Sequence, residues 1–172
     1  SGDATKFDDF INVIYKIDGD WVCDMYPVTT EPGESILRRP IKEVRHKGTA
    51  ILQPNQYRST YIIGWHGNRS RGHTALVQRG GKVKVWRDNN RDTVPDYHGP
   101  EEDGWFGINI HKHRGSDARV NTGSVSAGCQ VFQKSTDFAE FMDTCQDSAD
   151  RYGNSFTYTL IEEKDLTEKG VC

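Results

Sequence analysis

Residues 107–132 of the chain read GINIHKHRGSDARVNTGSVSAGCQVF. A short apolar run, Ile108–Ile110, has the character of a buried strand and leads directly to His111. A loop rich in Gly, Ser, Asn and Asp follows and closes on the tetrapeptide Ser126–Cys129, after which Val131-Phe132 resumes buried structure. The stretch therefore predicts two neighbouring strands, with a histidine at the end of one and a cysteine at the start of the other.

A histidine and a cysteine are the two residues that a cysteine-nucleophile mechanism needs. An imidazole can take the proton of a thiol, and the imidazolium that results stabilises the thiolate. The small residues Ser126, Ala127 and Gly128 before Cys129 allow a sharp backbone turn. Such a turn aims backbone N–H groups at a developing oxyanion. We therefore predict that His111 is the base and Cys129 the nucleophile.

The same residues resemble the signature of the L,D-transpeptidase catalytic-domain family (the YkuD type). In that signature a strand-borne Ile-His is followed, after a loop, by Ser/Thr-His-Gly-Cys. Here the loop runs from Lys112 to Val125, and Ala127 stands in the place of the signature histidine. Gln130-Val131 replaces the usual pair of an apolar residue followed by Arg or Asn. The resemblance extends from Gly107 to about Leu160.

The resemblance implies an enzyme that acts on peptidoglycan stem peptides through a thioacyl intermediate, with no cofactor or metal. It implies that the backbone carbonyl of Lys112 orients His111 in place of an acidic third member. The N–H groups of Ala127, Gly128 and Cys129 are expected to bind the oxyanion. Substrate contacts are expected from residues at the rim of the site, namely His113, Gln130 and Trp105.

Several alternatives remain open at the level of sequence. The thioacyl group can pass to an amine, as in an L,D-transpeptidase, or to water, as in an L,D-carboxypeptidase or endopeptidase of a phage lysin or antibacterial effector. A wall-binding module with a decayed site is a third possibility. His111-x-His113 with Cys129, and with His66 or His73 as a further ligand, also fits a zinc-dependent hydrolase. Otherwise His66 and His73 are expected at the surface.

Composition limits the class of protein. The 172 residues carry a formal net charge of −3, so we expect no nucleic-acid partner. No apolar run approaches the roughly 18 residues of a membrane span, and no signal peptide is visible. We expect a monomer that acts on the cell wall or in the periplasm, and that is secreted, virion-associated or injected. One domain over residues 1–172 is expected, with residues 1–10 and 162–172 as peripheral tails.

Local patterns predict a mostly β fold, either a β-sandwich or a curled mixed sheet, with one C-terminal α-helix. Asp18-Gly19 joins two β-rich runs and predicts a hairpin, and Gly80-Gly81 predicts a second hairpin between residues 74–78 and 82–86. Residues 135–152 have helical spacing of apolar side chains, with Ser135 or Thr136 as the cap and Gly153 as the end. Residues 156–160 alternate as a final strand.

The polar stretch from Asp88 to Gly104, hereafter the 88–104 connection, leads into the His111 strand and is expected to border or cover the groove, together with Trp105. Its start, Asp88–Asp92, imitates a calcium loop but lacks the later Gly and Glu, so a polar turn is expected instead. Among the other cysteines, Cys23 and Cys145 are expected to pack in the interior, and Cys172 has no assignable role.

Overall fold

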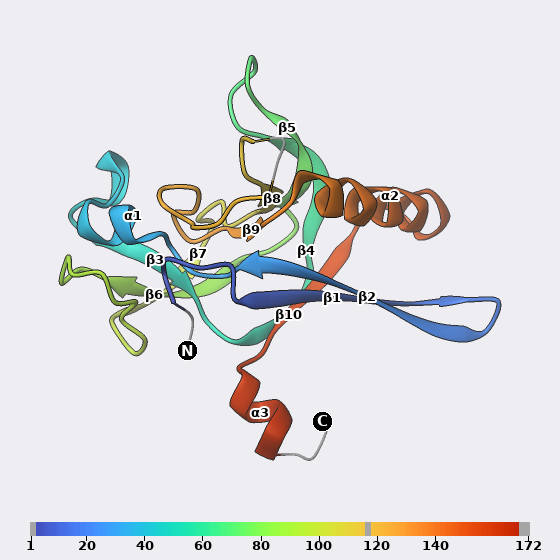
Figure 1. Ribbon diagram of the computed structural model, residues 1–172, viewed down its shortest axis with the longest axis horizontal. Coiled ribbons are helices and arrows are strands. Elements are labelled where there is room, and N and C mark those ends of the chain that lie inside the picture. Colours follow the sequence, from blue (N-terminus) through green and yellow to red (C-terminus); the bar gives the residue numbers. More distant parts are fainter. Residues whose placement is uncertain (1–2, 116–117, 169–172) are drawn as a thin grey trace.

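The computed structural model describes residues 3–115 and 118–168. The chain is mostly β, with a large mixed sheet that curls and few helices (Figure 1). The described residues form a seven-stranded sheet in the order β1-β2-β9-β8-β5-β4-β10 and a three-stranded sheet in the order β3-β6-β7. The strands of the large sheet are β1 (Asp9–Ile17), β2 (Asp20–Thr29), β4 (Asn55–His66), β5 (His73–Gln78), β8 (Ile110–Lys112), β9 (Gln130–Phe132) and β10 (Phe156–Leu160).

The small sheet contains β3 (Thr49–Leu52), β6 (Val83–Asp88) and β7 (Glu101–Gly104). Within the described residues, three α-helices accompany the sheets where the sequence predicted one. They are α1 (Glu34–Arg38), α2 (Ser135–Tyr152) and α3 (Glu163–Glu168), and a 3-10 helix, η1, covers Lys42–Val44. Only α2 is long. The two additional α-helices are five and six residues long, too short for an apolar periodicity to mark them in the sequence.

The hairpin at Asp18-Gly19 is confirmed. β1 and β2 pair antiparallel along their whole length, and both turn residues have positive φ (52° and 97°), as a type I′ turn requires. One face of this long ribbon is exposed and apolar, and it includes Ile14, Trp21 and Met25. The expectation that Cys23 packs in the interior is wrong, because its side chain lies on the same exposed face.

The predicted hairpin at Gly80-Gly81 is wrong. β5 pairs with β4 and β8 in the large sheet, whereas β6 pairs with β3 and β7 in the small one. The two glycines carry the chain from one sheet to the other against β4. The N–H of Gly80 donates to Thr60 O (2.8 Å), and a Cβ on Gly80 would lie 2.1 Å from Ser59 O. Glycine is needed here for close approach to a neighbouring strand, rather than for a turn.

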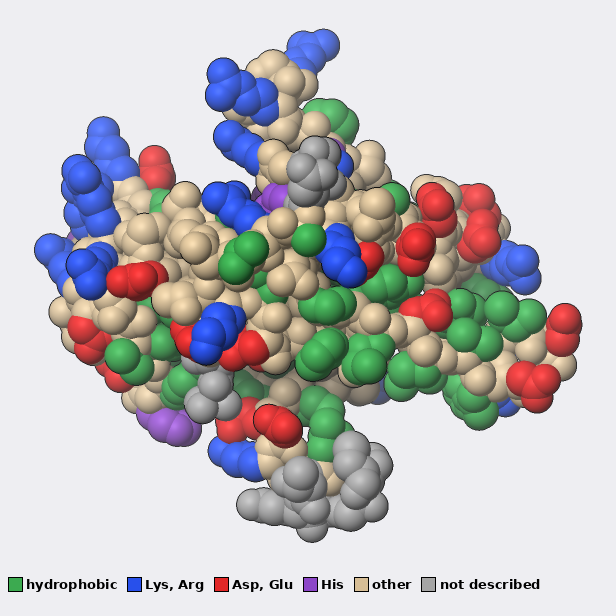
Figure 2. Space-filling model, in the orientation of Figure 1, with side chains coloured by type: hydrophobic (Ala, Val, Ile, Leu, Met, Phe, Trp, Pro, Cys, Tyr) green, Lys and Arg blue, Asp and Glu red, His purple; other side chains and the backbone are tan. Residues whose placement is uncertain are grey.

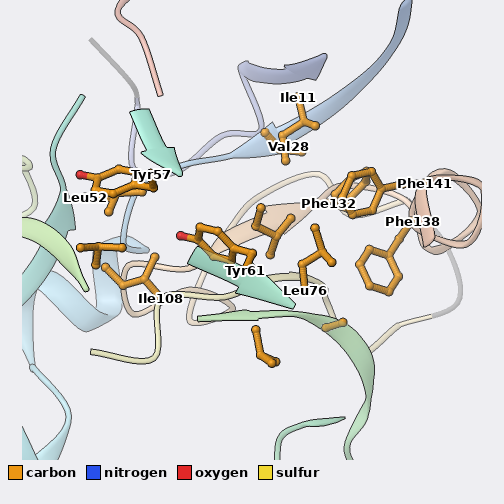
Figure 3. Close-up of a cluster of buried hydrophobic side chains, with 14 of the residues drawn as sticks. Ile11, Val28, Leu52, Tyr57, Tyr61, Leu76, Ile108, Phe132, Phe138 and Phe141 are labelled. Carbon is orange, nitrogen blue, oxygen red and sulfur yellow. The ribbon is translucent and has the colours of Figure 1, made fainter. Parts of the chain in front are cut away.

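The core lies between the large sheet, the small sheet and α2 (Figure 3). Phe138 and Phe141 of α2 pack on Phe132 of β9, with ring centroids 5.3 and 4.9 Å apart. Cys145 is buried on the same helix face, as predicted. Gly153 ends the helix at φ 95°, but Ser135 does not cap it. Ser135 is instead the first helical residue, and its hydroxyl donates to Gly115 O.

Parts of the two segments that were predicted to be peripheral tails, residues 1–10 and 162–172, form regular structure or pack against the rest of the protein. Asp9 and Phe10 belong to β1, and Ala4 is buried. The side chain of Thr122, in the loop before Cys129, donates to Ala4 O, and its N–H donates to Thr5 O (3.1 Å). At the other end α3 covers residues 163–168. Residues 1–2 and 169–172, including Cys172, lie outside the described residues.

Candidate active site

The parallel pair β8–β9 places the predicted base and nucleophile in neighbouring segments at one end of the pair. Ile110 is paired with Gln130 and His111 with Val131, and the N–H of Gln130 donates to Asn109 O (2.9 Å). Cys129 therefore lies beside Asn109, two residues before His111 along the strand direction. Cys129 immediately precedes β9, and its Sγ contacts the backbone of Gly107 and Asn109, in the segment that leads into the His111 strand.

The ring of His111 is held in one tautomer. Its Nδ1 lies 2.7 Å from the carbonyl oxygen of Lys112, which is the contact that the family resemblance implies. A carbonyl oxygen only accepts, so Nδ1 carries the proton and Nε2 is left with a lone pair. Burial is the main cause that lowers the pKa of His111 to about 3, with a smaller contribution from His66. At neutral pH the ring is therefore an uncharged base.

Two histidines that sequence reasoning placed at the surface pack around this base. His66 and His73 are opposite each other at the ends of β4 and β5, and the ring of His66 stacks on His111 with centroids 4.1 Å apart. The amide of Asn109 donates to Nδ1 of His66 (2.9 Å). Burial lowers the pKa of His66, and lowers that of His73 to about 4. The sequence does contain a signal that predicts this pairing. The turn-rich segment 67–72 is typical of a hairpin, and a hairpin there places the flanking histidines, His66 and His73, opposite each other.

The thiol of Cys129 is half-buried and rests as a neutral group. It donates to Gly107 O (3.5 Å) and accepts from the N–H of Asn109 (3.4 Å). Burial raises its pKa to about 11, and the Asn109 N–H offsets only part of this. In the parts of the chain that the structure describes, no hydrogen bond joins the thiol to His111. The resting pair is thus a thiol and an imidazole, and an ion pair forms only when the proton moves.

The turn before Cys129 is fixed by Ser126. Its buried hydroxyl donates to Cys129 O (2.7 Å) and accepts from the N–H of Gly128 (3.1 Å). The expectation that Gly128 N–H binds the oxyanion is therefore wrong, because that donor is already used. Among the described residues, no hydrogen bond is found for the N–H of Ala127 or of Cys129. These two donors remain for a ligand.

Gly128 has a backbone conformation that other residues rarely adopt. Its φ is +114°, and a Cβ there would lie 2.4 Å from the carbonyl oxygen of Ala50 in β3. The carbonyl of Ser126 also accepts from Gly33 N (3.0 Å), which ties the turn to the start of α1. The turn is thus clamped between β3 and α1, so the Cys129 backbone has a fixed position.

Two predicted substrate-binding residues are structural. Gln130 is fully buried, where its Nε2 donates to Gly128 O (3.3 Å) and its Oε1 accepts from Tyr158 OH (3.0 Å). His113 is 3% exposed; its Nδ1 accepts from Gly115 N (2.9 Å), so its Nε2 donates to Gln133 O (3.0 Å). His113 follows the last residue of β8, and its buried ring bonds to backbone groups instead of reaching the rim of the site. Both ring nitrogens of His113 are used in these hydrogen bonds, so His113 is not free to be the zinc ligand that the alternative requires.

Trp105, from which a substrate contact was expected, lies beside the nucleophile turn. It is 56% exposed and lines a small groove of ≈160 Å³ together with Ala127 of the nucleophile turn. The other lining residues belong to the segment from α1 to β3, to β6, and to the position after Trp105. They are Ile36, Ile41, Thr49 and Ala50, then Arg87, and finally Phe106. The groove therefore begins at the turn that carries Cys129.

The 88–104 connection is mostly packed on the small sheet. Its last four residues form β7, Asp88 accepts from Asp96 N (3.0 Å), and Tyr97 OH donates to Glu31 (2.7 Å). Asn90 and Asp92 accept from backbone N–H groups two residues ahead. The calcium-like start of the connection is thus a series of side-chain-capped turns, as expected. Within residues 3–115 and 118–168, no three His, Cys, Asp or Glu are arranged to hold a metal ion.

No protein-family model matches the chain, and neither a curated protein nor a solved structure matches it. The resemblance to L,D-transpeptidases therefore rests on the motif residues alone. In the described part of the chain, no helix has the length and apolar character needed to cross a membrane.

Proposed function

We propose that the protein is a cysteine acyl-transfer enzyme that acts on amide bonds of peptidoglycan stem peptides. The observation that carries the proposal is the contact of His111 Nδ1 with Lys112 O (2.7 Å). It leaves Nε2 as a neutral base on β8, beside the segment that ends in Cys129. The motif resemblance adds the substrate class.

The first half of the reaction forms the thioacyl enzyme. The Cys129 thiol leaves Gly107 O and turns toward His111, whose Nε2 takes its proton as Sγ attacks the amide carbonyl carbon. The oxyanion is bound by the N–H groups of Ala127 and Cys129. The C–N bond then breaks, and the imidazolium of His111 gives its proton to the leaving amine. The Lys112 carbonyl holds the ring while it is charged.

The second half releases the acyl group. Either water or an amine loses a proton to His111 Nε2 and attacks the thioester carbon, and Cys129 leaves as the thiolate and regains the proton. Water gives hydrolysis, and an amine gives a cross-link. The groove beside Ala127 is lined on one side by the exposed ring of Trp105, so this ring lies where it can control which of the two enters.

The test is mass spectrometry of purified muropeptides after incubation with the wild-type protein and with Cys129→Ala. Wild type is expected to give trimmed or cross-linked products, whose masses differ, and Cys129→Ala none. Cys145→Ala is the matched control, because that buried thiol lies on α2 within the core. Product formation by Cys129→Ala at the wild-type rate would refute the mechanism. Binding of muropeptides by the wild type without any product would favour a wall-binding module.

A further inference from the structure

A second pocket lies next to α1 and η1 and is lined almost entirely by arginine. Its lining residues are Arg38, Arg39, Pro40, Arg45 and Arg91, around a volume of ≈170 Å³. Three segments supply the four guanidinium groups: the end of α1, the residue after η1 and the tip of the 88–104 connection. In Figure 2 blue side chains gather at the left, where Figure 1 places α1.

The positive charge of this pocket is poorly compensated by the protein. Arg38 pairs with Glu34 (3.2 Å) at the surface, where solvent screens the interaction. Arg45 Nε donates to Pro40 O (3.4 Å). No ion pair of Arg39, Arg45 or Arg91 is found among the residues that the structure describes. This local charge contrasts with a chain whose formal net charge is −3.

The backbone at Arg91 also favours a role for its side chain. Its φ is +65°, a conformation that is uncommon for residues other than glycine. The neighbouring turns through Asn90 and Asp92 hold the residue in this conformation. Arginines from segments distant in the sequence thus line one space at the surface.

The size and chemistry of the pocket select its ligand. Its ≈170 Å³ is small beside the roughly 300–1,000 Å³ of sites for whole drug-sized ligands, so it fits a single group. Guanidinium forks pair with the oxygens of phosphate or carboxylate, and three phosphate oxygens satisfy more forks than two carboxylate oxygens do. No aromatic ring lines the pocket, so it has no platform on which a nucleic-acid base would stack.

We propose that this pocket binds a phosphate group. The same short segment lines both the pocket and the catalytic groove: Arg38 and Pro40 lie between Ile36 and Ile41, which line the groove. Three residues of chain span at most about 11 Å, so one ligand can occupy both places. The phosphate is either free or carried by a larger ligand that extends from the groove. This binding does not require the reaction proposed above.

The experiment is isothermal titration with inorganic phosphate at constant ionic strength, balanced with chloride. Arg39→Gln/Arg91→Gln removes two charges from the pocket. Arg58→Gln/Arg151→Gln removes two exposed charges that line no described pocket and serves as the control. We expect saturable 1:1 binding that weakens about tenfold or more in the pocket variant and stays unchanged in the control. Circular dichroism of both variants shows whether each is folded.

Methyl phosphate and dimethyl phosphate, titrated in the same way, distinguish a terminal monoester from an internal diester as the source of the group. Binding that does not saturate, or that weakens equally in both variants, would overturn the proposal. Acetate that binds as tightly as phosphate would overturn the ligand class, as would an oligonucleotide that binds equally well to the pocket variant and the wild type. Because the readout is binding without turnover, failure here leaves the proposed reaction untouched.

Discussion

The nucleophile loop, residues 113–129, and the 88–104 connection are both long, polar stretches that end beside the groove, yet they are held in different ways. In the nucleophile loop, the side chains of Thr122 and Ser126 point inward and bond to backbone groups, and both are at most 1% exposed. The connection instead packs on its own small sheet, where β7 pairs with β6, and its buried Asp88 accepts from Asp96 N (3.0 Å) within the connection. Inward-directed bonds around Cys129 preorganise a reactive group, whereas the connection contributes a wall near its end.

The largest expected effect separates His111 from His113, which lie near each other but act differently. His111→Ala removes the base and should lower the rate roughly a hundredfold or more. His113→Ala leaves Gly115 N without its partner and removes one of the two donors to Gln133 O, the other being Arg119 N. The variant should therefore cost about 1–3 kcal/mol of unfolding free energy with only a small change in rate. Steady-state kinetics and urea unfolding on both variants measure this. A hundredfold loss in a folded His113→Ala would show that the base is assigned to the wrong residue.

The next effect concerns the turn. Ser126→Ala leaves Gly128 N–H and Cys129 O without their shared partner, so the nucleophile loses its fixed position. We expect about a 10- to 100-fold loss in kcat/KM and about 1–3 kcal/mol lower stability. Ser124→Ala, in the same loop but more exposed, is the control. If Ser126→Ala keeps full activity, the turn is not preorganised by its hydrogen bonds.

A smaller effect tests the wall of the groove. Trp105→Ala should change KM and the ratio of hydrolysis to transfer by a few-fold, because its ring lines the groove and controls entry to the thioester. Val94→Ala, at the exposed tip of the connection, should change neither. Product ratios at several acceptor amine concentrations provide the measurement. Equal effects of the two variants would mean that the whole connection, and not its end, covers the site.

The smallest expected effect is a flat pH profile. The pKa of His111 is lowered to about 3 and that of Cys129 raised to about 11, so both stay in their reactive neutral forms between these values. kcat/KM should therefore change little from pH 5 to 9. An ordinary histidine would instead protonate below pH about 6.5 and reduce the rate tenfold per pH unit. An inflection near 6.5 would show that the imidazole is more hydrated than its burial implies.

The comparison of the two regions also explains what the sequence could predict. The β1–β2 hairpin, α2 and the relation of His111 to Cys129 depend on local signals: a turn dipeptide, a helical period and a spacing. The stacked His66, the crossing at Gly80 and the buried roles of Gln130 and His113 depend on which strands become neighbours. A histidine or glutamine has the same side-chain chemistry at the surface and in the interior. Only the order of strands in the sheet decides which of these two environments it occupies.

Gly128 illustrates how a packing requirement can pass for a catalytic one. The space for any side chain at this position is taken by the carbonyl oxygen of Ala50, and its φ excludes most residues. A library of substitutions selected only for folding, with Cys129 already replaced by Ala, should still retain glycine here. Recovery of many residue types in that selection would show that the reaction, and not β3, restricts the position. In a Gly-Cys motif of this kind, the glycine is thus required by the packing of the turn against β3, and the cysteine by the proposed reaction.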